Sequence, residues 1–151
     1  MTDHDAAARA EAAQRGIARW QAHRLAVLHG PDEERSAALS ALQPTDGEEL
    51  MHLILAVATE AAVALHEYRV ALPAPMRMAP FAIDPRAGYS PMQLTSAQIV
   101  TAAANRDHDM LMALVLPWVN GTHHAERVED LLEHLLVMAI HHHSHVCGDG
   151  R

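Results

Sequence analysis

Prolines divide the chain into three parts. Two parts are able to form helices, and the proline-rich part between them is not able to do so. Five of the eight prolines fall between Leu72 and Leu94, where each ring removes an amide donor and clashes with the preceding turn of a helix. The rest of the 151-residue chain is rich in alanine and leucine and poor in aromatic residues, which favours helix over strand. The sequence therefore predicts helices on both sides of a long irregular crossover.

We expect an all-α fold, a bundle of four to six helices in which the proline-rich crossover packs on one side. Residues 1–151 are expected to form a single helical domain, frayed at about 1–5 and 147–151, with an ordered crossover at about 72–94. Periodicity and capping signals place helices at about 6–29, 31–43, 46–71, 95–104, 110–118 and 122–145.

Local signals fix the expected ends and faces of these helices. Thr45–Glu48 and Thr95–Gln98 fit capping boxes, and Asp107 or Asp109 fits a helix-start residue. The buried stripe of the first helix is expected to contain residues at steps of three or four, which are Ala10, Ala13, Ile17, Trp20, Arg24 and Leu28.

The long helix after Thr45 has a broad apolar arc and a narrow polar strip. This strip is expected to carry Glu49, His52, Glu60, His66 and Glu67. Glu49 and His52 form one of the two Glu-x-x-His pairs that a di-iron carboxylate bundle needs, and the last helix supplies no second pair in register. Exposure on the polar strip explains Glu49 and His52 more simply than a metal site does. Glu60 lies between apolar turns, so it would need a charged or hydrogen-bonding partner if it were buried.

Charge excludes several classes of function. The chain has eleven arginines, no lysine and nineteen acidic residues, for a net charge of -8. A nucleic-acid-binding face needs basic residues, and so does a polybasic membrane surface. The single cysteine excludes an internal disulfide framework. The start of the chain lacks a secretory signal and no apolar run reaches about 18 residues, so we expect a soluble, cytoplasmic protein.

Histidine is the residue that most suggests chemistry, with thirteen copies. His134, His141 and His145 fall on one edge of the last helix at 100° per residue. His141 and His145 are spaced i, i+4, which lets two imidazoles share a divalent metal such as zinc. His142 and Cys147 are possible further ligands. His134 lies about 10 Å from His141 along the axis, so a two-histidine site completed by another helix or chain is the metal hypothesis.

Two alternatives compete with this metal site. The same edge contains Arg127, as an ordinary solvated border of a helix does. His108–Asp109 resembles the His-Asp dipeptide of helical metal-dependent phosphohydrolases, but the resemblance covers two residues, and His4–Asp5 matches equally well. An enzyme of that class is therefore the third hypothesis, after protein association and metal binding.

Apolar surface supports protein association as the leading hypothesis. Leu135–Ile140 is apolar around the whole helix circumference, and Leu53–Ala58 is nearly so, which places such helices at a core or an interface. We expect a homodimer or a stable complex with a protein partner that buries part of these helices. No nucleic-acid or membrane partner is expected.

The crossover offers a second candidate contact. It is too apolar for a disordered linker, so it either covers core or contacts a partner or ligand. Phe81 and Ile83 are expected to be largely buried beneath it. Its candidate interaction residues are Met76, Met78, Phe81 and Tyr89.

Overall fold

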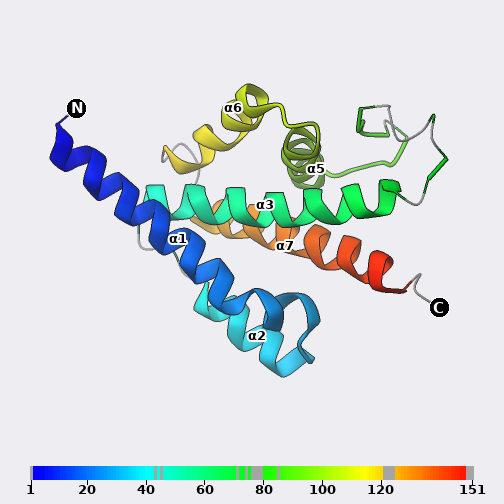
Figure 1. Cartoon of the computed structure of the whole chain (residues 1–151), viewed down its shortest axis with the longest axis horizontal. Helices are drawn as coiled ribbons and strands as arrows, with labels where there is room; N and C mark the ends of the chain where they lie inside the picture. Colours follow the sequence, from blue (N-terminus) through cyan, green and yellow to red (C-terminus); the bar gives the residue numbers. More distant parts are fainter. Residues whose placement is uncertain are drawn as a thin grey trace. The chain divides into compact units, whose positions relative to one another are not determined.

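The computed structural model describes residues 2–42, 44, 46–70, 72–73, 75, 80–84, 86–120 and 125–148, with the backbone alone for 125–126 and 142–148. These residues form six helices and no strand (Figure 1), which confirms the all-α prediction. The chain separates into two compact units, Met1–Ala56 and Val57–Arg151. The long helix α3, Gly47–Val70, runs from one unit into the other. The single domain and the packing of the crossover stay predictions.

Helix α1, Asp3–His29, begins three residues earlier than expected. Thr2 and Asp5 form a capping box in which the Thr2 hydroxyl accepts a hydrogen bond from the Asp5 amide and the Asp5 carboxylate accepts from the Thr2 amide. The Thr2 hydroxyl also donates to Asp5, which holds the pKa of that carboxyl below its ordinary value. The sequence predicts no cap at this position, because Thr2 and Asp5 lie within the five residues expected to fray.

The buried face of α1 is rotated from the expected stripe. Ala10 is exposed and Ile17 is 40% exposed, whereas Gly16 is buried. Gly16 lies against the start of α3, where a Cβ at this position would stand 2.5 Å from the carbonyl oxygen of Glu49. A glycine is therefore part of the packed face, which contains Ala12, Gly16, Trp20, Val27 and Leu28.

Helix α2, Asp32–Ala41, follows Pro31 and packs against α1. Acidic residues occupy its first turn, where the helix dipole favours negative charge. Arg35 joins the two helices, because its Nε donates a hydrogen bond of 2.8 Å to the carbonyl oxygen of Val27. Leu42, the residue that follows the last turn of α2, is 2% exposed and belongs to the core.

Helix α5, Pro91–Ala104, starts four residues before the capping box expected at Thr95. The actual cap is Ser90, whose hydroxyl accepts from the amide of Gln93 while the Gln93 side chain accepts from the amide of Ser90. Pro91 is the first residue of this helix, a position at which its missing amide costs nothing. The sequence predicts Pro91 to lie in the crossover, before a helix that begins at Thr95.

In the second unit, α5 packs against both α6, His108–Val119, and α7, Ala125–Gly148. Asp107, one of the two predicted helix-start residues, caps α6, since its Oδ1 accepts from the amide of Met110 at 3.1 Å. Helix α7 continues to Gly148, past the expected end near His145. The most deeply buried large side chains of this unit are Val57, Ile99, Val100, Val115, Leu131 and Leu135.

Helix α3 is long and apolar enough, by composition, to cross a membrane, and it is the one described helix that is. A core helix of a soluble protein meets the same criterion, so the support for a membrane span is weak. The helix also carries Glu49, which is fully buried between arginines of α1. The structure is compatible with a soluble protein.

Candidate interaction surface

Helix α6 is the most apolar helix in the described part of the chain, yet half of its twelve residues are exposed. The ten residues from Met110 to Val119 contain no charged side chain. Of these ten, Val115 and Trp118 are buried, whereas Met110 is 51% exposed and Leu116 is 38% exposed. A helix that is apolar on all sides is normally covered on all sides, so the exposed apolar side of α6 is a candidate contact surface.

The exposed residues of α6 form one continuous arc. At 100° per residue, Val115 and Trp118 point towards the core of the second unit. The opposite side carries four exposed apolar residues over about 120° of the helix circumference, which are Met110, Ala113, Leu116 and Pro117. We call these four residues the α6 arc. Their i, i+3, i+6 and i+7 spacing is typical of a helix that docks against another helix.

A tight turn fixes α6 to the end of α5. The amide of Arg106 donates to the carbonyl of Ala103, and the amide of Asp107 donates to the carbonyl of Ala102, which is the hydrogen-bond pattern of a Schellman motif. Arg106 has a φ of 57°, in the left-handed region. The turn thus ends α5 and places Asp107 to cap α6 without any intervening loop.

Replacing Arg106 with glycine should raise the free energy of unfolding by about 0.5–1 kcal/mol. A left-handed conformation costs a residue with a Cβ about 1–2 kcal/mol, and the greater freedom of glycine in the unfolded chain offsets part of that gain. Urea denaturation measures the effect. Arg106→Ala is the matched control, because it removes the guanidinium but keeps the Cβ. A glycine variant no more stable than the alanine variant would contradict the strained turn.

Asn105, in the same turn, holds the segment around Phe81. Its side-chain oxygen accepts a hydrogen bond of 2.7 Å from the Phe81 amide, and its side-chain nitrogen donates one of 2.9 Å to the Phe81 carbonyl. One amide side chain therefore satisfies both backbone groups of Phe81. This contact fixes residues 80–84 beside the end of α5.

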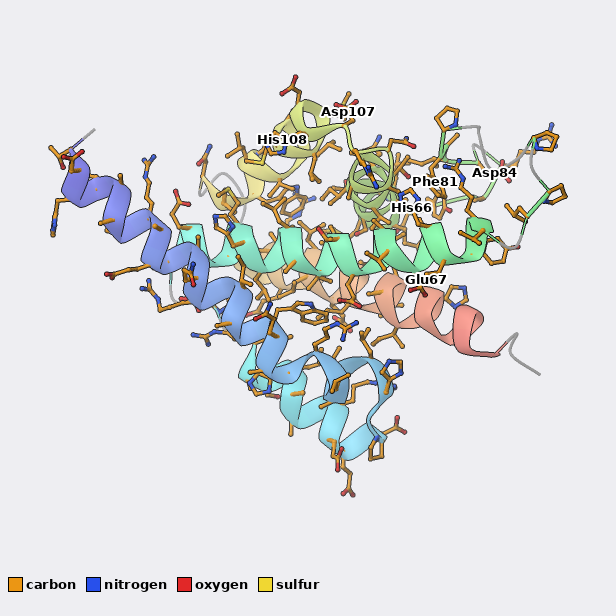
Figure 2. The ribbon with its side chains drawn as sticks, in the orientation of Figure 1. His66, Glu67, Phe81, Asp84, Asp107 and His108 are labelled. Atoms are coloured by element: carbon orange, nitrogen blue, oxygen red, sulfur yellow. The ribbon has the colours of Figure 1, made fainter. Side chains whose placement is uncertain are left out.

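The ring of Phe81 rests on the last turns of α3 (Figure 2). The guanidinium carbon of Arg69 lies 3.8 Å from the ring centroid, which is a cation–π contact. His66 meets the ring edge-on, with centroids 5.1 Å apart, and its Nε2 lies 2.7 Å from the carbonyl oxygen of Ala104. Because a carbonyl only accepts, Nε2 carries the proton in this bond. These contacts tie α3, α5 and the Phe81 segment together.

A pocket of about 260 Å³ opens beside Met110 between α5, α6 and Ile83. Its polar side chains include Asn105 and Asp107, both engaged in the hydrogen bonds given above. The pocket is small for a ligand site, since typical ligand pockets measure about 300–1,000 Å³. It continues the apolar surface of α6 towards α5, and its remaining lining residues are Gln98, Thr101, Ala102 and Leu114.

The structure describes two of the four interaction residues predicted in the crossover, and their role stays a prediction. Met76 and Met78 lie outside the described residues. Tyr89 is 44% exposed. Phe81 and Ile83 are half-buried rather than largely buried in the described part of the chain, and the Phe81 ring lies against Arg69 and His66 of α3.

The two apolar stretches expected at an interface are mostly covered. Val137 is the one exposed large side chain between Leu135 and Ile140, and it stands next to exposed charged residues such as Glu133. Between Leu53 and Ala58, no side chain is exposed. Uniform apolarity in these helices therefore reflects burial, and the apolar helix left at the surface is α6.

The histidine edge of α7 is described only in part. The Nδ1 of His134 lies 2.7 Å from the carbonyl oxygen of Asp130 on its own helix, and His141 is exposed. The side chains of His142, His145 and Cys147 lie outside the described residues. In the described part of the chain, no three His, Cys, Asp or Glu side chains are placed to hold a metal ion. The zinc site at His141 and His145 stays a prediction.

The burial of Glu49 is the largest departure from the sequence-based prediction. Glu49 was placed on the polar strip of α3, but its side chain is fully buried. Its Oε1 lies 2.6 Å from Nη2 of Arg19, and its Oε2 lies 3.5 Å from Nε of Arg15. Glu60, the carboxylate singled out for burial, is only half-buried. Glu49 and His52 therefore do not form a surface Glu-x-x-His pair.

The charges around Glu49 form a network within the first unit. Arg15 also contacts Asp46 at 2.9 Å, and Arg9 lies 3.6 Å from Glu48. Asp46 caps α3 by accepting from the amide of Glu49 at 2.8 Å. That hydrogen bond, with Arg15, holds the pKa of Asp46 below its ordinary value, so the stabilising effect of this cap is lost as the pH falls through the lowered pKa. The network is structural, since it fastens α1 to the start of α3.

No protein-family model matches the chain, and neither the curated proteins nor the solved structures show significant similarity to it.

Proposed function

We propose that this chain is a non-enzymatic helical protein that acts by associating with another protein, and that the α6 arc is the contact surface. The single observation that supports this proposal is the exposure of apolar side chains in the uncharged stretch Met110–Val119 of α6, with Met110 51% and Leu116 38% exposed. Exposed apolar surface that is contiguous, rather than scattered, is typical of interaction sites.

A membrane surface fits the α6 arc less well than a protein does. Helices that lie in a membrane interface carry lysine or arginine on their polar face, whereas the charged residues at the start of α6 are Asp107 and Asp109. The net charge of -8 would also oppose binding to anionic lipids. A protein partner requires neither a basic polar face on α6 nor a positive net charge.

Photo-crosslinking from Ala113 tests the proposal. A benzophenone amino acid at Ala113, the middle of the α6 arc, should give covalent protein adducts on irradiation of cells that express the chain. The matched control carries the same amino acid at Gln21, an exposed polar position on α1, and should give few. Equal adduct yields at the two positions, or none at Ala113, would overturn the proposed surface.

A further inference from the structure

We infer that the protein that covers the α6 arc is a second copy of this chain, with the two α6 helices crossing antiparallel at Ala113. This inference rests on the proposed function and specifies the partner. Charge and shape, both properties of the described second unit, lead to it.

Charge selects α6 as the place where two copies can meet. At a net charge of -8, most faces of two copies repel each other. The stretch from Met110 to Val119 has no charged side chain, so a second copy can contact these ten residues without placing like charges in direct contact. A self-associating surface needs this property, whereas a surface for a basic partner would carry acidic residues within it.

Repulsion between the Asp109 carboxylates of the two copies also favours an antiparallel arrangement of the two α6 helices. Asp109 is the charged residue next to the α6 arc, four residues or about 6 Å before Ala113 along the axis. A parallel pair would place both Asp109 carboxylates at one level. An antiparallel pair separates them by about 12 Å along the axis, beyond the screening length of about 8 Å at physiological ionic strength. It also sets each helix N-terminus beside the C-terminus of the other, which the helix dipoles favour.

The shape of the α6 arc is self-complementary about Ala113. Ala113 has the smallest side chain in the arc and lies three residues from both Met110 and Leu116. A two-fold axis through Ala113 brings Met110 of each copy against Leu116 and Pro117 of the other, so that every contact occurs twice. A small residue at the crossing lets the helix axes approach to about 8–10 Å.

Two features limit the affinity to the micromolar range. The α6 arc alone offers an area at the low end of specific interfaces, below about 1,200 Å² in total. In addition, Pro117 has no amide hydrogen, so the carbonyl of Ala113 cannot receive the usual i+4 hydrogen bond of a helix. Closing the interface over that carbonyl removes water from it, which is unfavourable. We therefore expect a monomer–dimer equilibrium that depends on protein concentration.

Light scattering tests the inference on the full chain. The apparent mass should rise from 16.5 kDa towards twice that value between low and high micromolar concentration. Ala113→Glu, which sets two carboxylates near the two-fold axis, should weaken dimerisation at least about 100-fold, as like charges at an interface cost several kcal/mol. The matched control is Ala22→Glu on α1, also at an exposed alanine, which should dimerise as the unaltered chain does.

Disulfide trapping tests the geometry. At axes about 8–10 Å apart, two Cα atoms of Ala113 that face each other lie about 3.5–5.5 Å apart, which overlaps the range that a disulfide needs. In a Cys147→Ser background, Ala113→Cys should form a disulfide-linked dimer quickly on oxidation, and Asp109→Cys should not. Preferential linkage through Asp109→Cys would indicate a parallel pair and overturn the antiparallel crossing.

The outcomes separate this inference from the proposed function. A chain that stays monomeric at high micromolar concentration, or Ala113→Glu and Ala22→Glu variants that dimerise equally, overturns the second copy as partner. If the Ala113 photo-adducts then have masses other than twice that of the chain, the proposed association through the α6 arc still stands. Circular dichroism checks that each variant keeps its helical content, which an exposed alanine position allows.

Discussion

Replacing Arg19 with methionine is expected to lower the free energy of unfolding by about 3 kcal/mol. Arg19 contacts the fully buried Glu49 carboxylate at 2.6 Å, and removal of one partner from a buried ion pair leaves an uncompensated charge, at a cost of about 3–5 kcal/mol. Arg15 stays near Glu49 at 3.5 Å, which puts the expected loss at the lower end of that range. Urea denaturation at neutral pH measures it.

Two further variants separate the ion pair from simple packing. Arg15→Met should cost at most about 1 kcal/mol, because the Arg15 side chain is 48% exposed and water screens its charge. Arg19→Met combined with Glu49→Met should recover most of the stability lost in the single variant, since a buried ion pair replaced by apolar residues is often neutral or stabilising. A double variant as unstable as Arg19→Met alone would show that the ion pair is not the cause.

The sequence does not reveal the ion pair of Glu49 with Arg19, because no local pattern connects the two residues. Glu49 sits next to His52 on the face of α3 with fewest apolar residues, so periodicity places it in solvent. Its partners Arg15 and Arg19 are about thirty residues earlier, and no local rule connects them. The i, i+4 spacing of these two arginines is a weak signal, because it shows only that they share one side of α1. Burial of Glu49 depends on which side of α1 meets α3, a tertiary property.

Helix boundaries are predictable to within a few residues where a capping residue lies in the local sequence. Asp107, one of the two helix-start residues expected for α6, caps that helix. For α5 the sequence predicts a cap at Thr95, whereas Ser90 caps this helix and Pro91 is its first residue. Thr45, proposed to cap α3, lies outside the described residues, and Asp46 accepts the hydrogen bond that a cap receives. Local chemistry thus located each helix but not always the residue that starts it.

The candidate surface was only partly predictable. The sequence shows that α6 is apolar from Met110 to Val119 but not how much of that surface neighbouring helices cover. Leu135–Ile140 is equally apolar and is mostly buried in the structure. A short helix at the end of a tight turn contacts α5 along one side, which leaves the other side uncovered. Hydropathy cannot distinguish a covered apolar helix from an uncovered one, because both have the same composition.

Replacing Gly16 with alanine is expected to lower the free energy of unfolding by about 1–2 kcal/mol, the reverse of what helix propensity predicts. In an exposed helix interior, alanine is favoured over glycine by about 1 kcal/mol. At Gly16, however, the new Cβ would stand 2.5 Å from the carbonyl oxygen of Glu49 and 3.2 Å from the Cβ of His52. The backbone of α3 must then move away from α1, and overpacking of this kind costs about 1–3 kcal/mol.

The sign of the change in the free energy of unfolding distinguishes an effect of close packing from an effect of helix propensity. Ala18→Gly, two residues away at an exposed position of α1, should cost about 1 kcal/mol from propensity alone. If propensity also governed Gly16, Gly16→Ala would stabilise the chain by a similar amount. A destabilised Gly16→Ala variant, measured by urea denaturation beside Ala18→Gly, therefore reports directly on the contact between α1 and the start of α3. The same displacement would lengthen the pairing of Glu49 with Arg15 and Arg19, so Gly16→Ala and Arg19→Met should cost less together than the sum of their separate effects.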